Sequence, residues 1–202
     1  MSFITWIPLN PKRSGTRKLL ASRQVAHAMI ESCFPDRNDN AEGRILWRLD
    51  REGGLGLVIV SPTLPAVDGV VEQCGFGASD TQPITANYSS SLSAINNGDV
   101  VTIRAMLNAA QHNESGKRTA VYASEVGEWV KSKLIQSGLD VVSLTIDEHS
   151  TDTFRRGAHA VTLALVSVKA EVIVRDRDAF RTALVYGVGA AKGYGCGLIT
   201  IE

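Results

Sequence analysis

One histidine with two polar neighbours at helical spacing could carry acid–base chemistry in this chain. Gln24 lies three positions before His27, and Glu31 lies four positions after it. On a helix, this spacing places the three side chains on one face. An imidazole titrates near neutral pH, so His27 is a candidate general acid or base. The alternative is a histidine at the edge of an apolar stripe that pairs with Glu31 across one helical turn.

A glycine-rich loop near the C-terminus is a second candidate site. It holds Gly187, Gly189, Gly193, Gly195 and Gly197, with Lys192 among them. A dinucleotide fingerprint needs a strand before the glycines and a helix after them, whereas here a helix is expected before them. A phosphate loop needs Gly-Lys-Ser/Thr, and Lys192 is followed by another glycine. The loop could still bring its backbone close to a phosphate. The alternative is a turn and bulge before a last strand.

The histidines and cysteines lack the spacing of metal ligands. They are His27, His112, His149 and His159, and Cys33, Cys74 and Cys196. None of the cysteines forms a CxxC pair, so we expect no metal and no cofactor. Three scattered cysteines are typical of reduced, buried thiols in a cytoplasmic protein.

Composition indicates an ordinary globular protein. The 202 residues carry 21 basic and 21 acidic side chains, and 44% of the residues are hydrophobic. These values exclude a disordered or collagen-like chain, and no apolar run approaches a membrane span. The charge is uneven: six basic residues face two acidic ones in residues 1–37, seven face four in 154–202, and eight face fifteen in 38–153. We expect the two ends to build a positive surface, with chance as the alternative.

The first half of the chain predicts the element order of a ferredoxin-like domain. Strands are expected at 2–8, 44–50, 54–61 and 99–109, a helix at 19–34, a short helix at 63–75, and polar loops at 10–18 and 76–97. This order is β-α-β-β-α-β.

The second half predicts a similar unit. Helices are expected at 124–136 and 176–187, strands at 139–146, 160–174 and 198–201, and a polar loop at 147–157. We therefore expect an α+β protein with two tandem ferredoxin-like (RRM-like) domains, the first over residues 1–112 and the second over 113–202.

Several segments resemble the CasE-type CRISPR repeat-processing endoribonucleases of type I-E effector complexes. GVGAAKGYGCGLITI (187–201) is similar to the C-terminal glycine-rich motif of the family, and QVAHAMIESCFPD (24–36) to its histidine-bearing N-terminal helix. RILWRLD (44–50), VTIRAMLNA with GKRTAV (101–121), and residues 165–189 match further elements in order. The family has two ferredoxin-like domains in tandem, which agrees with the predicted elements.

The resemblance implies a metal-independent cut on the 3′ side of a CRISPR repeat RNA hairpin. A ribose 2′-OH attacks the adjacent phosphate and leaves a 2′,3′-cyclic phosphate. His27 matches the catalytic histidine of the family. Where the family commonly has a tyrosine, this chain has Gln24. Gln24 can orient the 2′-OH or the phosphate by hydrogen bonding, but it cannot titrate. Tyr194 in the glycine loop could substitute, although the resemblance does not assign it a role.

The resemblance also implies RNA-binding residues and protein partners. Arg155 and Arg156 fall where the family places a basic loop or hairpin against the RNA stem. The remaining candidates share a basic or loop character: Lys192, Lys12, Arg13, Arg17, Lys18, Gly189, Gly193 and Gly195. Expected partners are the repeat hairpin and the other subunits of an RNA-guided surveillance complex. Two alternatives stay open: a hairpin-binding subunit that cleaves slowly or not at all, and a domain that binds a small phosphorylated ligand.

Overall fold

The computed structural model describes residues 1–36, 43–51, 53–77, 81–112, 115–116 and 118–202. Contacts within the chain divide it into two compact units. The first unit contains residues 1–93 together with Gly193–Gly195, and the second contains residues 94–192 and 196–202. Each unit holds one four-stranded antiparallel sheet. The α+β fold with two ferredoxin-like units is thereby confirmed.

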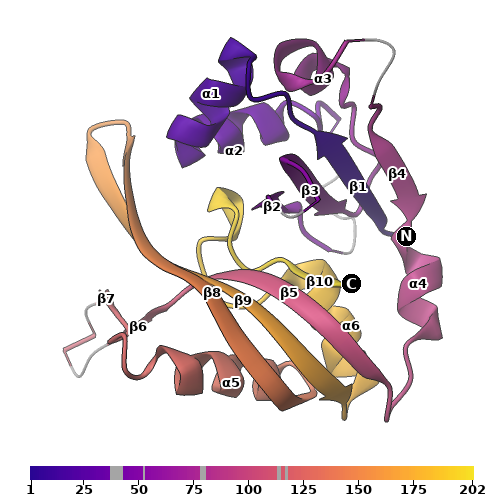
Figure 1. The fold of residues 1–202 in the computed structure, drawn as a ribbon, viewed down its shortest axis with the longest axis vertical. Coiled ribbons are helices and arrows are strands. Elements are labelled where there is room, and N and C mark those ends of the chain that lie inside the picture. The colour runs from indigo at the N-terminus through magenta and orange to yellow at the C-terminus, as the bar shows by residue number, and fades with distance from the viewer. Residues whose placement is uncertain (37–42, 52, 78–80, 113–114, 117) are drawn as a thin grey trace. The chain divides into compact units, whose positions relative to one another are not determined.

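The first sheet has the strand order β2-β3-β1-β4. Its elements along the chain are β1 (Phe3–Pro8), α1 (Ser14–Ala21), α2 (Arg23–Glu31), β2 (Leu46–Asp50), β3 (Gly56–Ser61), α3 (Asp68–Cys74) and β4 (Ile84–Asn87), followed by α4 (Tyr88–Ala94). This is the β-α-β-β-α-β order, with the first helical position divided between α1 and α2. Figure 1 shows the three helices α1 to α3 gathered beside this sheet.

The second sheet has the strand order β10-β5-β9-β8. Its elements are β5 (Val100–Asn108), α5 (Val126–Gln136), β8 (Leu139–Arg156), β9 (His159–Val174), α6 (Arg177–Tyr186) and β10 (Ile199–Ile201). The short strands β6 (Ala110–His112) and β7 (Arg118–Ala120) form a separate ladder, and the 3₁₀ turn η1 covers Lys192–Tyr194. Counted from β5, the main elements repeat the β-α-β-β-α-β order of the first unit.

The predicted position of the fourth strand of the first half is wrong. The sequence predicts residues 99–109 at that position, but β5 pairs with β9 and β10 in the second sheet. The fourth strand of the first sheet is β4, within the segment expected as a polar loop. Every residue of β4 is exposed, so no apolar alternation marks it in the sequence. The division between the units therefore falls at Ser93 and Ala94, earlier than the boundary expected after residue 112.

Two helices replace the single helix expected at 19–34, and the loop expected at 10–18 is partly helical. The break is Ser22, which has an extended backbone with φ −152° and ψ 119°. Its side chain accepts a hydrogen bond from the Val25 N–H, so Ser22 ends α1 and caps the start of α2. Serine is a favoured residue at this capping position.

The polar segment after residue 146 is also strand rather than loop. The ladder between β8 and β9 runs from Leu139 to Arg156 and contains two register shifts. β5 pairs only with residues 165–173 of β9, so the far ends of β8 and β9 extend past the sheet as a two-stranded ribbon. In this ribbon Phe154 and Leu163 are buried while most of the other side chains are exposed, so its sequence carries only a sparse apolar pattern. Figure 1 shows the ribbon projecting from its sheet.

The first unit has a clear apolar core between its sheet and helices. Ala26 and Ile30 of α2 are buried in it together with Trp47 of β2 and Ile59 of β3. In the second unit, α5 and α6 bury Val130, Leu134, Phe180 and Leu184, and one face of β9 is buried through Val166, Val168 and Val172. The predicted helix at 176–187 is confirmed as α6, with the carboxylate of Asp176 capping its N-terminus.

Candidate active site

His27 is presented by the outer face of α2. The inner face of the helix carries Ala26 and Ile30, which are both 1% exposed. Burial of these residues fixes the rotation of the helix, and this rotation leaves the His27 side chain 31% exposed. The imidazole is therefore held on a rigid element and remains accessible to solvent, as a proton-transferring group must be.

Glu31 lies one turn further along the same helix face. Its Oε1 atom is 3.7 Å from Nδ1 of His27. This separation is too long for a hydrogen bond, although it falls within the range of an ion pair with a protonated imidazole. The pairing expected from the sequence is therefore present, but it does not occupy the ring nitrogens with a short bond.

The glycine-rich loop returns to α2 and places Tyr194 beside His27. The two rings are in edge contact, with 5.5 Å between their centroids and an interplanar angle of 62°. The Tyr194 hydroxyl donates to Oε1 of Gln24 at 3.3 Å. A guanidinium nitrogen of Arg23 donates to the backbone oxygen of Tyr194 at 2.7 Å. Arg23, Gln24 and His27 of α2 thus all contact one loop residue.

Trp47 holds the loop through a hydrogen bond and a ring contact. Its indole Nε1 donates to the backbone oxygen of Gly193 at 3.0 Å, and its ring is 1% exposed. A Cβ atom at Gly195 would lie 2.6 Å from this ring, and the Gly195 φ angle is +78°. Both facts require glycine at position 195. Trp47 also belongs to the apolar core of the first unit, so its bond ties the loop to that core.

Gly193 leaves space over the histidine. A Cβ atom there would lie 3.5 Å from Cε1 of His27 and 3.6 Å from its Nδ1. These are ordinary contact distances, and the Gly193 φ angle lies outside the left-handed region. A side chain at Gly193 would therefore cover part of the imidazole, which glycine leaves without that contact.

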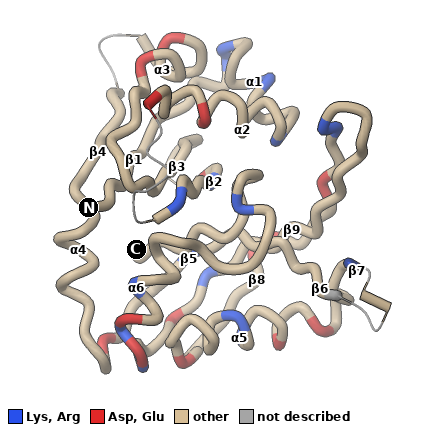
Figure 2. The backbone as a smooth tube through the Cα atoms, turned by 180° about the vertical axis from the view of Figure 1, so that it is seen from behind, with Lys and Arg blue, Asp and Glu red and all other residues tan. Residues whose placement is uncertain are grey.

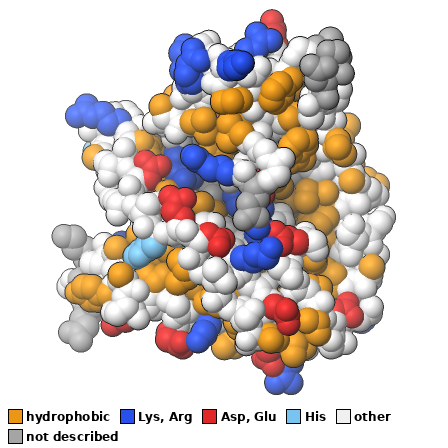
Figure 3. All heavy atoms as spheres, in the orientation of Figure 1, with side chains coloured by type: hydrophobic (Ala, Val, Ile, Leu, Met, Phe, Trp, Pro, Cys, Tyr) orange, Lys and Arg blue, Asp and Glu red, His pale blue; other side chains and the backbone are white. Residues whose placement is uncertain are grey.

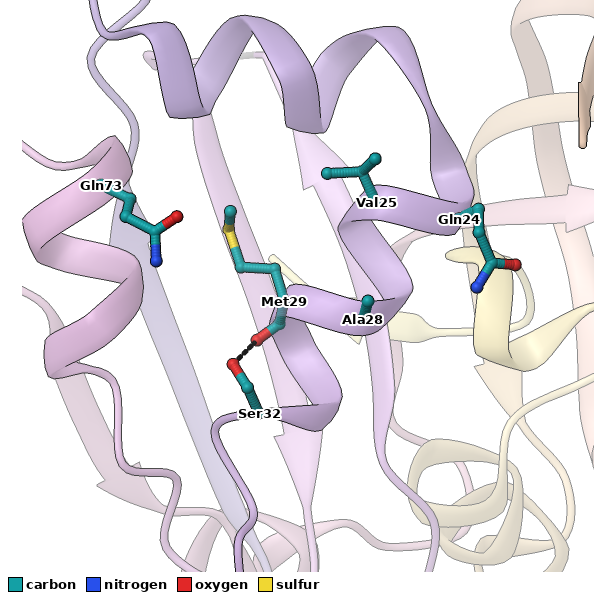
Figure 4. Close-up of a pocket in the computed structure, with 6 residues that line it drawn as sticks. All are labelled: Gln24, Val25, Ala28, Met29, Ser32 and Gln73. Atoms are coloured by element: carbon teal, nitrogen blue, oxygen red, sulfur yellow. Dashed lines mark hydrogen bonds between the residues drawn. The ribbon is translucent and has the colours of Figure 1, made fainter. Parts of the chain in front are cut away.

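A pocket with a volume of about 430 Å³ lies on the neighbouring face of α2. It is lined by Gln24, Val25, Ala28, Met29, Ser32 and Gln73. Figure 4 shows Gln24 at one end of this pocket and Gln73, from α3, at the other. Gln24 therefore belongs both to the pocket and to the group around His27.

The structure brings together four of the residues predicted from the sequence: Gln24, His27, Gly193 and Gly195. Lys12, Arg13, Arg17 and Lys18 form a different group, which is exposed around the start of α1. Arg17 donates to the backbone oxygen of Lys12, and Arg13 donates to that of Gly75. Figure 3 shows basic side chains gathered over this end of the first unit.

The remaining predicted residues belong to the second unit. Arg155 and Arg156 are exposed at the tip of the β8–β9 ribbon, opposite Ala160 and His159. Figure 2 shows basic positions at this tip. Lys192 is half-buried at the start of η1, and Gly189 is exposed with φ +73°. The Lys117 of the GKRTAV segment lies outside the described residues.

Sequence reasoning missed Arg23 as part of this site. Arg23 and Tyr194 are 171 positions apart, so no local pattern could connect them. Tyr194 was recognised only as a possible substitute for a residue at position 24. Its location beside His27 follows from the return of the loop to α2, which periodicity in the sequence cannot show.

A protein-family model described as CRISPR associated protein matches residues 2–202. The chain belongs to this family. Membership confirms the resemblance drawn from the sequence to CRISPR repeat-processing proteins. The family match covers both four-stranded units and all the residues around His27.

Solved structures of CRISPR-associated proteins have the same fold as this family member. The CRISPR endoribonuclease Cse3 bound to a 19-nucleotide RNA aligns with a TM-score of 0.83 at 21% identity, covering 100% of this chain and 99% of that one. A Thermus thermophilus Cse3 with an RNA representing a pre-cleavage complex also gives a TM-score of 0.83 at 21% identity, with coverage of 100% and 98%. Cas6e from Escherichia coli aligns with a TM-score of 0.66 at 16% identity, with coverage of 100% and 99%.

A comparison with curated protein sequences finds no match. Among the described residues, no group of three or more His, Cys, Asp or Glu side chains could hold a metal ion. No helix in the described part of this family member has the length and apolar character needed to cross a membrane.

Proposed function

We propose that this protein is an endoribonuclease that cleaves CRISPR repeat RNA on the 3′ side of its hairpin without a metal ion. It then stays bound to the guide RNA within a surveillance complex in the cytoplasm. The observation that carries the proposal is the accessible His27 imidazole beside the returning glycine loop. Support comes from family membership and from the similarity to structures named as Cse3 endoribonuclease with RNA and as an RNA-guided surveillance complex.

The proposed reaction is an internal transesterification. The 2′-oxygen loses its proton and bonds to phosphorus, while the bond from phosphorus to the 5′-oxygen breaks and that oxygen takes up a proton. The products are a 2′,3′-cyclic phosphate and a 5′-hydroxyl. His27 performs one of the two proton transfers, a contribution of about 10²- to 10⁴-fold in rate.

Gln24 assists without exchanging protons in this proposal. Its amide group lies on the same helix face as His27 and already accepts the Tyr194 hydroxyl. An amide has two N–H donors that can bond to the 2′-OH or to a phosphate oxygen. The role proposed for Gln24 is therefore to orient the substrate.

RNA binding is proposed to use the exposed cations of both units. Arg155 and Arg156 at the ribbon tip rank first, because a projecting two-stranded ribbon can reach along an RNA stem. The other proposed contacts are Lys192, the α1 group of Lys12, Arg13, Arg17 and Lys18, and the loop backbone at Gly189, Gly193 and Gly195. Each contact with a phosphate adds to the salt dependence of binding.

The test is cleavage of the repeat RNA from the same genome in EDTA, with wild type and His27→Ala compared in single turnover. We expect the wild type to give a cyclic-phosphate end and the variant to lose at least 10²-fold in rate. A substrate with a single 2′-deoxy sugar at the cut site should resist both proteins. Equal affinity of both proteins for the deoxy RNA and equal melting temperatures serve as controls. Cleavage that survives in His27→Ala would show that another residue carries the chemistry.

The presence of Gln24 favours one alternative, a subunit that holds the hairpin and cleaves slowly or not at all. Tight, salt-dependent binding of the RNA by a wild type that does not cut would support it. Binding of a small phosphorylated compound in place of RNA would support the other alternative, in which the glycine loop holds such a ligand.

A further inference from the structure

Tyr194 is held in place through its backbone and its ring, while its hydroxyl makes a weaker bond. Arg23 fixes the backbone oxygen at 2.7 Å, and the ring rests against His27. The hydroxyl donates to Oε1 of Gln24 at 3.3 Å, which is longer than the usual range for an O–H···O bond. Exchanging this long bond for a shorter one to a charged acceptor would be favourable.

The hydroxyl must act as the donor in this pair, because an amide oxygen only accepts. The structure thus places a neutral O–H donor beside the imidazole of His27. Two hydrogen bonds of about 2.8 Å to different oxygens of one phosphate can span up to roughly 8 Å. The two rings are in edge contact, with 5.5 Å between their centroids, so both side chains face one small region in which a single phosphate can be placed.

We infer that Tyr194 is a second catalytic residue, whose hydroxyl leaves Gln24 and donates to a non-bridging oxygen of the scissile phosphate. This inference rests on the proposed function. The hydroxyl keeps its proton throughout, so its contribution is stabilisation of the negative charge that builds on the phosphorane. Removal of one such donor typically costs about 10²- to 10³-fold in rate.

The geometry also explains how the site works with Gln24 on the helix. A hydroxyl from the loop reaches to within 3.3 Å of the Gln24 side chain. A phenol attached at position 24 and one attached at position 194 would therefore place their hydroxyl groups in the same region. The inference predicts that the two positions are interchangeable as sources of the hydroxyl.

The test compares Tyr194→Phe with the double variant Tyr194→Phe/Gln24→Tyr. The single variant keeps the ring contact with His27 and the backbone bond from Arg23, and it removes only the hydroxyl. We expect its single-turnover rate on the repeat RNA to fall by about 10²-fold, with RNA affinity and melting temperature close to wild type. The double variant should recover at least tenfold relative to Tyr194→Phe.

The matched control is Tyr122→Phe, which removes a hydroxyl from a tyrosine that is 74% exposed and should cleave at the wild-type rate. If the wild type cleaves and His27→Ala does not, a loss of less than tenfold in Tyr194→Phe overturns the inference while the proposed function stands. A larger loss that comes with weaker RNA binding, or that the double variant does not recover, assigns Tyr194 to support of the loop and also overturns it. A wild type that does not cleave removes the proposed function and this inference together.

Discussion

The indole Nε1 of Trp47 donates a hydrogen bond to the backbone oxygen of Gly193 at 3.0 Å. A core side chain of β2 thereby fixes the loop that carries Tyr194 to His27. The bond is made by a tryptophan that is almost fully buried, so the position of the loop depends on the packing of the first core. Stability and the proposed chemistry are coupled at this residue.

Trp47→Phe should lower both stability and cleavage. The change removes the N–H donor and leaves a cavity, and together these effects cost about 2–4 kcal/mol of unfolding free energy. Cleavage should fall further than the folded fraction alone explains, because the Gly193 carbonyl loses its partner. Denaturant unfolding and single-turnover rates measure the two effects. Trp129→Phe is the matched control, since Trp129 is only half-buried and contacts Lys133 on the surface of α5.

Gly195→Ala should destabilise the protein, and Gly193→Ala should not. At Gly195 the φ angle is +78° and a new Cβ would lie 2.6 Å from the Trp47 ring, so strain and a clash combine. At Gly193 the new methyl group meets His27 at 3.5 Å, an ordinary contact. We therefore expect a loss of about 2–4 kcal/mol for Gly195→Ala and less than about 1 kcal/mol for Gly193→Ala.

The same pair separates folding from activity. Gly193→Ala should fold normally but cleave more slowly, because its methyl group would contact the imidazole and hinder the approach of substrate from this side. Thermal melting and single-turnover cleavage of both variants provide the comparison. A Gly193→Ala protein that cleaves like wild type would mean that substrate approaches His27 from another direction.

Arg155→Ala/Arg156→Ala should weaken RNA binding without affecting the rate of the bound complex. Both side chains are exposed at the ribbon tip, so their loss removes up to two phosphate contacts. The slope of log K against log salt should become shallower by about one for each lost contact. Binding titrations at several salt concentrations measure this slope. Arg177→Ala, an exposed arginine at the start of α6, is the control and should leave the slope unchanged.

Periodicity in the sequence predicted the elements that have one buried face. Helices α2 and α6 each bury one face, so their apolar residues recur at helical spacing. Strands β2 and β3 are mostly or wholly buried, and each is a short apolar run next to turn residues. The elements that were missed lack this asymmetry. β4 is exposed throughout, and the outer part of the β8–β9 ribbon buries only a few side chains, among them Phe154 and Leu163.

The candidate site was only half predictable for a different reason. Gln24 and His27 share a helix face, and helical spacing alone places them together. Their loop partners are far away in the chain: Tyr194 lies 170 positions from Gln24, and Gly193 lies 146 positions from Trp47. Such contacts are set by tertiary packing, which no local pattern records.

Tyr88→Phe should stabilise the protein, and the gain should grow in alkaline solution. Tyr88 is 6% exposed, and its hydroxyl oxygen has no hydrogen-bond partner among the described residues. Burial raises the pKa of Tyr88 to about 12, although the nearby Arg48 acts in the opposite direction. Removing an unsatisfied buried hydroxyl should add about 1 kcal/mol at pH 7.

The pH dependence follows from the direction of this shift. Between about pH 10 and pH 12, the unfolded chain loses the Tyr88 proton while the folded chain keeps it, so the wild type loses stability as pH rises through this range. The phenylalanine variant lacks this term. The difference in unfolding free energy between variant and wild type should therefore be flat below pH 9 and widen by about 2 kcal/mol by pH 12. Denaturant unfolding of both proteins across this range tests it, and a constant difference would contradict the assigned burial of the hydroxyl.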